Sequence, residues 1–149
     1  MLKSIKVRDY MTSNLITVKP ETELFAAIEV FLKHRISGTP VVDEQGHLLG
    51  MLSEGDCLRG ILSGAYYEEV GGNVAAYMTR ELEVISPEAD IIEAAELFTR
   101  NRRRRLPVVE HGQLVGQISR CDVLRAVKEF AQHDNQGKFM RPEEYTELH

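Results

Sequence analysis

The sequence predicts an α/β (α+β) fold in which two copies of one β-α-β-β-α unit pack together as a pseudo-twofold pair. The first observation is a repeat: residues 7–12 read Val-Arg-Asp-Tyr-Met-Thr, and residues 74–79, 67 positions later, read Val-Ala-Ala-Tyr-Met-Thr. The second is that short β-branched runs alternate with helical periodicity in both halves. A unit of about 55 residues is marginal alone, so the halves are expected to pack against each other.

The repeat also sets the boundaries of the units. The same shift aligns the Pro-Val-Val triplets at residues 40–42 and 107–109. After a deletion of one residue in the following turn, the pattern Gly-x-x-Ser-x-x-Asp at 50–56 aligns with 116–122. We expect a first unit over residues 7–66, a linker over 67–73, a second unit over 74–131 and a C-terminal tail over 132–149.

Each unit begins with a short β segment, at residues 15–18 and 82–85, which ends at a proline-containing turn. A helix follows, predicted from apolar residues at helical spacing. These residues are Leu24, Ala27, Ile28, Phe31 and Leu32 in the first unit, and Ile91, Ala94, Ala95 and Phe98 in the second. Asp90 with Glu93 provides a capping signal for the start of the second-unit helix.

A β-hairpin and a second helix complete each unit. The Pro-Val-Val strand, a glycine turn and another apolar run, at residues 48–52 or 114–118, form the predicted hairpin. The second helices are expected to start at Ser53 and Ser119. Their apolar positions include Leu58, Ile61 and Leu62 in the first unit, and Val123, Leu124 and Val127 in the second.

Composition argues against several classes of function. No apolar run reaches the roughly 18–20 residues of a membrane helix, and the N-terminus lacks a signal-peptide core, so we expect a cytoplasmic protein without membrane association. The two cysteines and five histidines form no ligand pattern, so no metal site is expected. A net charge of −5 argues against nucleic-acid binding driven by overall charge. No catalytic motif is present, so we expect no catalytic residues and no enzyme activity.

The pattern Gly-x-x-Ser-x-x-Asp places Ser53 with Asp56, and Ser119 with Asp122, at strand-to-helix junctions. A carboxylate there can accept hydrogen bonds from both ribose hydroxyls, while the serine and the free helix N–H groups offer further polar contacts. The same pattern also satisfies an N-terminal helix cap with an acidic first turn. Because a duplicated fold also duplicates its caps, the residues alone leave both interpretations open.

Taken together, the twice-repeated Tyr-Met-Thr, helix, Pro-Val-Val strand, glycine turn and Gly-x-x-Ser-x-x-Asp resemble the paired CBS domain (Bateman) module over residues 7–130. The resemblance implies a compact pair with two related clefts, which in many members bind AMP, ADP, ATP or another adenosyl ligand. It further implies that Asp56 and Asp122, with Ser53 and Ser119 beside them, contact ribose. It also implies that two modules assemble into a disc-like homodimer.

The residues before the Pro-Val-Val strands differ between the units. The sequence Arg-Arg-Leu-Pro at 104–107 is similar to the His-Arg-Leu-Pro pattern that contacts phosphate in the gamma subunit of AMP-activated protein kinase, whereas Gly38 matches Arg105 in the first unit. Arginine suits phosphate because its planar fork donates two parallel hydrogen bonds. We therefore expect Arg104 and Arg105 to bind phosphate and the two clefts to be unequal. A solvated helix end or a nucleic-acid patch are the alternatives for this run.

An adenine ring needs an apolar slot with polar edges. The candidates are Ile16, Thr17, Thr39, Pro40, Val84, Ile85, Leu106 and Pro107, all of which could instead belong to the core. We expect a stand-alone regulatory module that uses no cofactor and in which an adenine nucleotide, as regulatory ligand, alters binding to a separate, unidentified partner protein. The alternatives are an oligomerisation module without nucleotide, and a nucleic-acid-associated regulator using the arginine run.

Overall fold

The computed structural model describes residues 1–66 and 71–133. The elements of the first half are α1 (Leu24–His34), β1 (Gly38–Val42), β2 (Leu48–Ser53) and α2 (Glu54–Tyr66). Those of the second half are α3 (Ile91–Asn101), β3 (Arg105–Glu110), β4 (Gln113–Ser119) and α4 (Arg120–His133). Short 3-10 helices occupy Leu2–Ser4, Val7–Asp9 and Val74–Ala76. The α+β class is confirmed; most of the predicted linker and tail lies outside the described residues.

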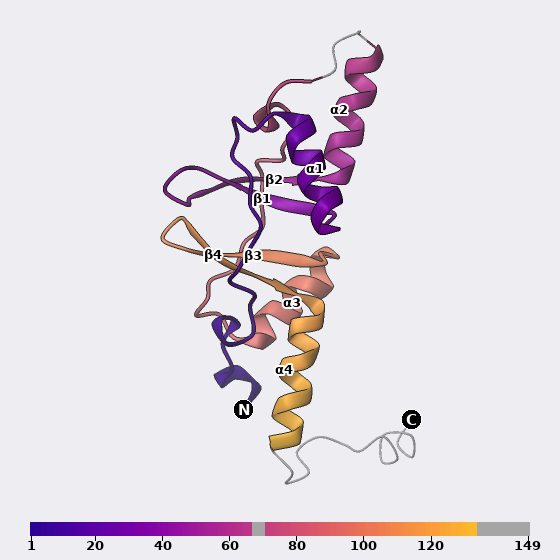
Figure 1. Cartoon of the computed structure of the whole chain (residues 1–149). Coiled ribbons are helices and arrows are strands. Elements are labelled where there is room, and N and C mark those ends of the chain that lie inside the picture. Colours follow the sequence, from indigo (N-terminus) through magenta and orange to yellow (C-terminus); the bar gives the residue numbers. More distant parts are fainter. Residues whose placement is uncertain (67–70, 134–149) are drawn as a thin grey trace, which may run out of the picture.

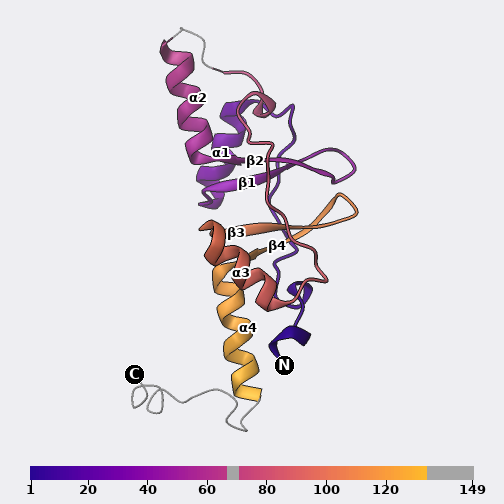
Figure 2. The ribbon, with the colours of Figure 1, turned by 180° about the vertical axis from the view of Figure 1, so that it is seen from behind.

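The two halves stack end to end, with the hairpins pointing to one side and the helices lining the other (Figures 1 and 2). Both hairpins are antiparallel and have the same register: Gly38 pairs with Ser53, and Arg105 with Ser119. The hairpin tips meet, because the Leu48 amide donates to the Gly112 carbonyl at 3.1 Å. The predicted hairpins and their pseudo-twofold relation are thus confirmed.

The predicted first β segments are shorter in the structure, where each reduces to a single parallel bridge, Val18 to Val41 and Ile85 to Val108. Proline explains the shortening. In a parallel ladder the next hydrogen bond would come from the amide of residue 40 or 107, and proline has no N–H. In the first half the Thr39 hydroxyl instead donates to the Ile16 carbonyl at 2.7 Å.

The first helix of each unit buries the predicted face. Its buried residues are Leu24, Ala27 and Phe31 in α1, and Ile91, Ala94 and Phe98 in α3. The Asp90 carboxylate accepts a hydrogen bond from the Glu93 amide at 2.9 Å, which confirms the predicted cap.

Four leucines at the predicted apolar positions of the helices are solvent-exposed: Leu32, Leu58, Leu62 and Leu124, with exposed fractions of 74%, 61%, 71% and 68%. Other apolar positions of the same helices face the core. In α2 the stripe that faces the core contains the buried Cys57 and the partly buried Ile61. In α4 it contains Val123 and Ala126.

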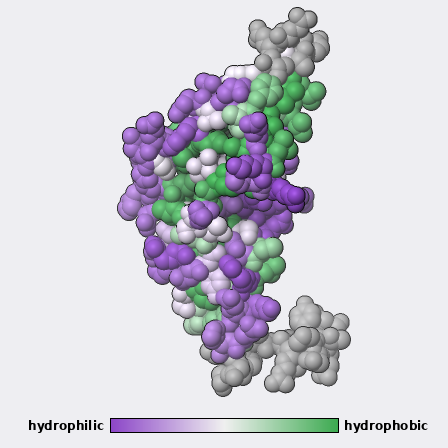
Figure 3. Space-filling view, viewed as in Figure 1, coloured by the Kyte–Doolittle hydropathy of each residue, from purple (hydrophilic) through white to green (hydrophobic). Residues whose placement is uncertain are grey.

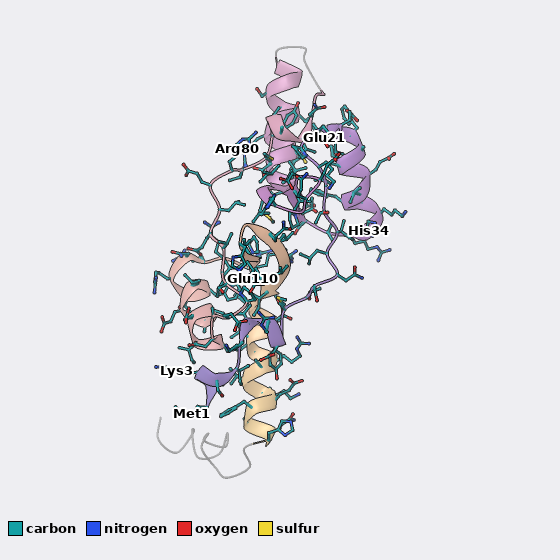
Figure 4. All side chains as sticks on the ribbon, turned by 90° about the vertical axis from the view of Figure 1, so that its left-hand side faces the viewer. Met1, Lys3, Glu21, His34, Arg80 and Glu110 are labelled. Carbon is teal, nitrogen blue, oxygen red and sulfur yellow. The ribbon has the colours of Figure 1, made fainter. Side chains whose placement is uncertain are left out.

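Each copy of the repeated hexapeptide packs on the other half. Val7 is fully buried in the core of the second half, and its amide donates to the Ala89 carbonyl at 2.8 Å. Val74 is fully buried in the core of the first half, and its amide donates to the Thr22 carbonyl at 2.8 Å. Figure 4 shows the N-terminal segment, with Met1 and Lys3, against the second half. Because each hexapeptide buries a valine in the core of the other half, this exchange stabilises the packing of the two halves.

Candidate functional site

Both Ser-x-x-Asp junctions form reciprocal helix caps. The Ser53 amide donates to Asp56 Oδ2 at 2.9 Å, and the Asp56 amide donates to Ser53 Oγ at 3.1 Å. The corresponding distances between Ser119 and Asp122 are 2.8 and 3.2 Å. Capping therefore accounts for one oxygen of each carboxylate. The other oxygen, Oδ1, takes no part in the cap.

The Oδ1 atoms accept hydrogen bonds from arginines one turn along each helix. Arg59 Nη2 lies 2.6 Å from Asp56 Oδ1, and Arg125 Nη2 lies 3.3 Å from Asp122 Oδ1. Thr79 also donates to Asp56 Oδ1, at 3.3 Å. The Arg59 side chain is 73% exposed, whereas that of Asp56 is only 8% exposed. A buried carboxylate is thus covered by an arginine that can move into solvent.

A cavity of about 230 Å³ lies beside Asp56, between the two halves, and we call it the inter-unit cleft. It is lined by Met51, Ser53 and Asp56 of the first half, by Thr79, Glu81, Leu82 and Glu83 of the connecting segment, and by Arg103, Arg105, Leu106 and Pro107 of the second half. The cleft combines an apolar wall with three carboxylates and two guanidinium groups. Asp56 comes from the first half, whereas both arginines come from the second half.

Five predicted site residues meet in this cleft: Ser53, Asp56, Arg105, Leu106 and Pro107. Arg104 does not line it; its side chain is exposed and its carbonyl accepts a hydrogen bond from the Arg120 amide at 3.2 Å. Arg103, which was not predicted, does line it. Alternation along an extended chain places residues two apart on the same side, and this rule could have selected Arg103 with Arg105.

The remaining adenine-pocket candidates lie outside this cleft's lining. Val84 is exposed and Ile85 belongs to the core of the second half. In the first half Thr39 is fully buried, with its hydroxyl bonded to the Ile16 carbonyl, and Pro40 is buried while Thr17 is exposed.

The second junction has different surroundings. Thr12 pairs with Gln117 as Thr79 pairs with Met51, so the repeat relates the two junctions. By the 67-residue shift, however, Gly38 stands where the second half has Arg105. By the repeat, the residues around Ser119 and Asp122 therefore include fewer cations than the residues around Ser53 and Asp56.

A second cavity, of about 470 Å³, adjoins the inter-unit cleft at Arg105. Arg35, Ser37 and Glu54 also line it. Arg105 lines both cavities, so the end of the inter-unit cleft that carries the arginines adjoins the second cavity, where Arg35 supplies another positive charge. A negatively charged group held by Arg105 would lie next to this opening.

Other chemistry at the site is limited. Burial, with the nearby charges of Asp56 and Glu54, raises the pKa of the Cys57 thiol, which disfavours the reactive thiolate. Within residues 1–66 and 71–133, no three histidine, cysteine or acidic side chains cluster as a metal site would require. In the same part of the chain, no helix combines the length and apolar character needed to cross a membrane.

The CBS domain family model matches residues 7–63 and 74–129. The crystal structure of CBSX2 in complex with AMP has a TM-score of 0.74 and 32% identity, over 85% of this chain and 98% of that chain. YhcV, a CBS domain-containing protein of Bacillus subtilis, is 33% identical over 78% of this chain and 81% of its own length. A Methanocaldococcus jannaschii protein, MJ1225, is 35% identical over 80% of this chain.

Several of these relatives are much longer. The chain spans 41% of MJ1225, 15% of the A-adding tRNA nucleotidyltransferase and 24% of the inosine-5'-monophosphate dehydrogenase, both from Aquifex aeolicus. The shared part is therefore the tandem module, which occurs both in enzymes and in small proteins such as YhcV.

Proposed function

Because the chain belongs to the CBS domain family and contains two such domains in tandem, we propose that it is a regulatory module, not an enzyme, which binds an adenine nucleotide and modulates a separate protein. One observation carries the proposal: a single cleft contains Asp56 together with Arg103 and Arg105. The AMP complex of CBSX2 supports it. Its place of action would be the cytoplasm.

The chemistry of the cleft fits the parts of a nucleotide. Asp56 Oδ1 would accept hydrogen bonds from the two ribose hydroxyls in place of those from Arg59 and Thr79. Arg105 would bind phosphate, with Arg103 beside it, because guanidinium groups bind phosphate bidentately. Leu106 and Pro107 would form the apolar wall against the base. Arg104 is left out of this set because it lies outside the cleft.

The second junction would form a weaker site. Ser119 and Asp122 repeat the ribose-binding geometry, and Ile16, Thr17, Thr39 and Pro40 would then lie toward the base. The glycine at position 38 supplies no cation for phosphate, so a nucleotide there loses a charge-assisted contact. We propose that this site fills only at higher nucleotide concentration.

The position of the cleft provides a means of regulation. A nucleotide bound there would link Asp56 of one half to Arg105 of the other. Its affinity would therefore depend on how the halves are arranged, which is the condition under which a ligand shifts a conformational equilibrium. A partner protein that favours one arrangement would bind more tightly, or more weakly, when nucleotide is present.

We also propose a homodimer that uses the side of the molecule lined by helices. The four exposed leucines, Leu32, Leu58, Leu62 and Leu124, all lie on these helices. Figure 3 shows hydrophobic surface along α2. Light scattering after size-exclusion chromatography would test the assembly, with Leu58→Asp plus Leu62→Asp as the dissociating variant. A wild-type chain that stays monomeric at all concentrations contradicts the dimer but leaves nucleotide binding intact.

Calorimetry with AMP, ADP, ATP and S-adenosylmethionine tests the ligand. We expect at least one of them to bind the folded, ligand-free protein. If none binds at millimolar concentration to the folded protein, the ligand-sensing function is contradicted. Salt-dependent binding of DNA or RNA that is lost when Arg102 to Arg105 are all changed to alanine would instead support the nucleic-acid alternative.

A further inference from the structure

The arginine one turn after each junction aspartate has different contacts in the two halves. Arg59 Nη2 lies 2.6 Å from Asp56 Oδ1. Its counterpart Arg125 lies farther from Asp122 Oδ1, at 3.3 Å, and donates a second hydrogen bond to the Tyr10 carbonyl at 3.1 Å. The Arg125 guanidinium carbon also lies over the Tyr10 ring, 5.4 Å from its centre, as in a cation–π contact. The repeat thus shows the same arginine in two positions, one on the aspartate and one shared with a tyrosine.

The first half contains the same tyrosine, in a fixed orientation. The 67-residue shift matches Tyr10 with Tyr77. The Tyr77 ring packs directly against Gly60, and its hydroxyl donates a hydrogen bond to the Gly71 carbonyl. Within residues 1–66 and 71–133, no cation–π contact joins this ring to Arg59. The position that Arg125 occupies in the second half is therefore not taken by Arg59 in the first.

The first half also has room for this second position. A cavity of about 400 Å³, which we call the Tyr77 cavity, is lined by both Arg59 and Tyr77. Two small residues of α2 that also line it, Ser63 and Gly64, match Glu129 and Phe130 in the second half. The Arg59 side chain is largely exposed, so its guanidinium can turn toward the Tyr77 ring while the helix stays in place.

In its present position Arg59 competes with a ligand for Asp56. Oδ1, the oxygen outside the cap, already accepts two hydrogen bonds, from Arg59 and Thr79, which use its two lone pairs. The bond from Arg59 is charge-assisted and is therefore the stronger of the two. Ribose hydroxyls can bind Oδ1 only after Arg59 has left it.

We propose that Arg59 is a latch on the inter-unit cleft. Paired with Asp56, it occupies the place of the ribose; turned onto the Tyr77 ring, it leaves that place open. Tyr77 and Thr79 belong to the segment between the two halves, and Thr79 lines the cleft. Binding of a ligand therefore creates a contact between α2 and that segment, by which a partner protein distinguishes the occupied module from the empty one. This inference rests on the proposed function and adds to it the residue that opposes ligand binding.

The first test is calorimetry of Arg59→Met, which removes the guanidinium and keeps an unbranched apolar stem. It is made in an Asp122→Asn background so that binding at the inter-unit cleft is measured. We expect adenosine to bind this variant about 3- to 10-fold more tightly than the parent, because no ion pair has to be broken. Adenosine is used beside AMP because, without a phosphate, it responds to position 59 only through Asp56. The matched control, Arg125→Met, should change the affinity by less than about 2-fold.

The second test removes the ring on which Arg59 would lie. Tyr77→Leu should weaken adenosine binding about 2- to 5-fold, because the open position loses its cation–π contact. Tyr77→Phe keeps the ring and should keep the affinity of the parent. In the Arg59→Met background, Tyr77→Leu should have no further effect, since the group that uses the ring is absent. Circular dichroism checks that each variant is folded.

The outcomes separate the latch from the proposed function. The latch is wrong if Arg59→Met binds adenosine no more tightly than the parent, or if Tyr77→Leu weakens binding equally in the Arg59→Met background. In either case, binding of AMP by the parent leaves the proposed function intact. If neither AMP nor adenosine binds the parent or any variant, the latch and the proposed function fail together.

Discussion

The two strand-to-helix junctions share one set of hydrogen bonds but have different neighbours. Ser53 with Asp56, and Ser119 with Asp122, form the same reciprocal cap, with matching distances. Only Asp56 is accompanied in a described cavity by two arginines and Glu83. The repeated residues thus build the same cap twice, whereas the residues that differ between the repeats give the two junctions different surroundings. These differences lie before the Pro-Val-Val strands and after Tyr-Met-Thr.

The largest expected effect comes from changing the two carboxylates separately. Asp56→Asn should weaken AMP binding about 30- to 100-fold, because a charged acceptor for the ribose hydroxyls is lost. Asp122→Asn is the matched control and should change the main affinity by less than about 3-fold. Calorimetry measures both. Equal losses in the two variants would show that the junctions are equivalent.

The next effect concerns the arginines. Arg105→Ala should weaken the binding of ATP about 10-fold, because a charge-assisted contact to phosphate is lost, and should leave the binding of adenosine nearly unchanged. Arg104→Ala is the control, since Arg104 is also exposed but lies outside the cleft. A titration of both variants with ATP and adenosine separates phosphate from base recognition. A larger loss for Arg104 than for Arg105 would contradict the assignment.

A substitution at Gly60 in α2 should have a smaller effect, on the free energy of unfolding. A Cβ atom there would lie 1.9 Å from the Tyr77 ring, so Gly60→Ala should destabilise the first half by about 1–3 kcal/mol despite the helix propensity of alanine. Gly55→Ala, whose Cβ would lie 3.3 Å from the end of the Arg59 side chain and 3.7 Å from Ser53 Oγ, is the control. Urea unfolding measures both. Equal stability of the two variants would mean that Tyr77 moves freely.

The smallest effect concerns the ion pairs that hold the N-terminal segment on the second half. Hydrogen bonds from Lys6 and then Arg8 lower the pKa of the exposed Glu88 carboxyl. The stabilisation is therefore present above the unfolded pKa, near 4.5, and is lost as the pH falls through the lower folded value. Thermal melting should show a small, salt-sensitive loss for Glu88→Gln at pH 7 that disappears near pH 2. A loss that persists at pH 2 would point to packing instead.

The repeat, the hairpins, the helices and their caps could be predicted from the sequence, because each depends on local spacing or on capping chemistry. The exchange of the hexapeptides could not, because self-similarity shows that Val7 and Val74 are equivalent but not which core each enters. The exposure of the four leucines could not be predicted either, because helical spacing identifies a stripe and not the direction it faces. Tertiary packing decided that direction.

The site was predicted in its parts but not in its combination. Asp56 and Arg105 were both identified, yet their meeting across the two units depends on how the halves pack. Arg104 was grouped with Arg105 because Arg-Arg-Leu-Pro resembles the His-Arg-Leu-Pro pattern, whereas alternation along the chain would have grouped Arg103 with Arg105.

The central claim is that one nucleotide joins the two halves, and a crystal structure of the chain grown with ATP tests it most directly. The account predicts a nucleotide in the inter-unit cleft, with its ribose on Asp56 and a phosphate on Arg105. A nucleotide found only beside Asp122, or with its phosphates away from Arg105, would contradict the account.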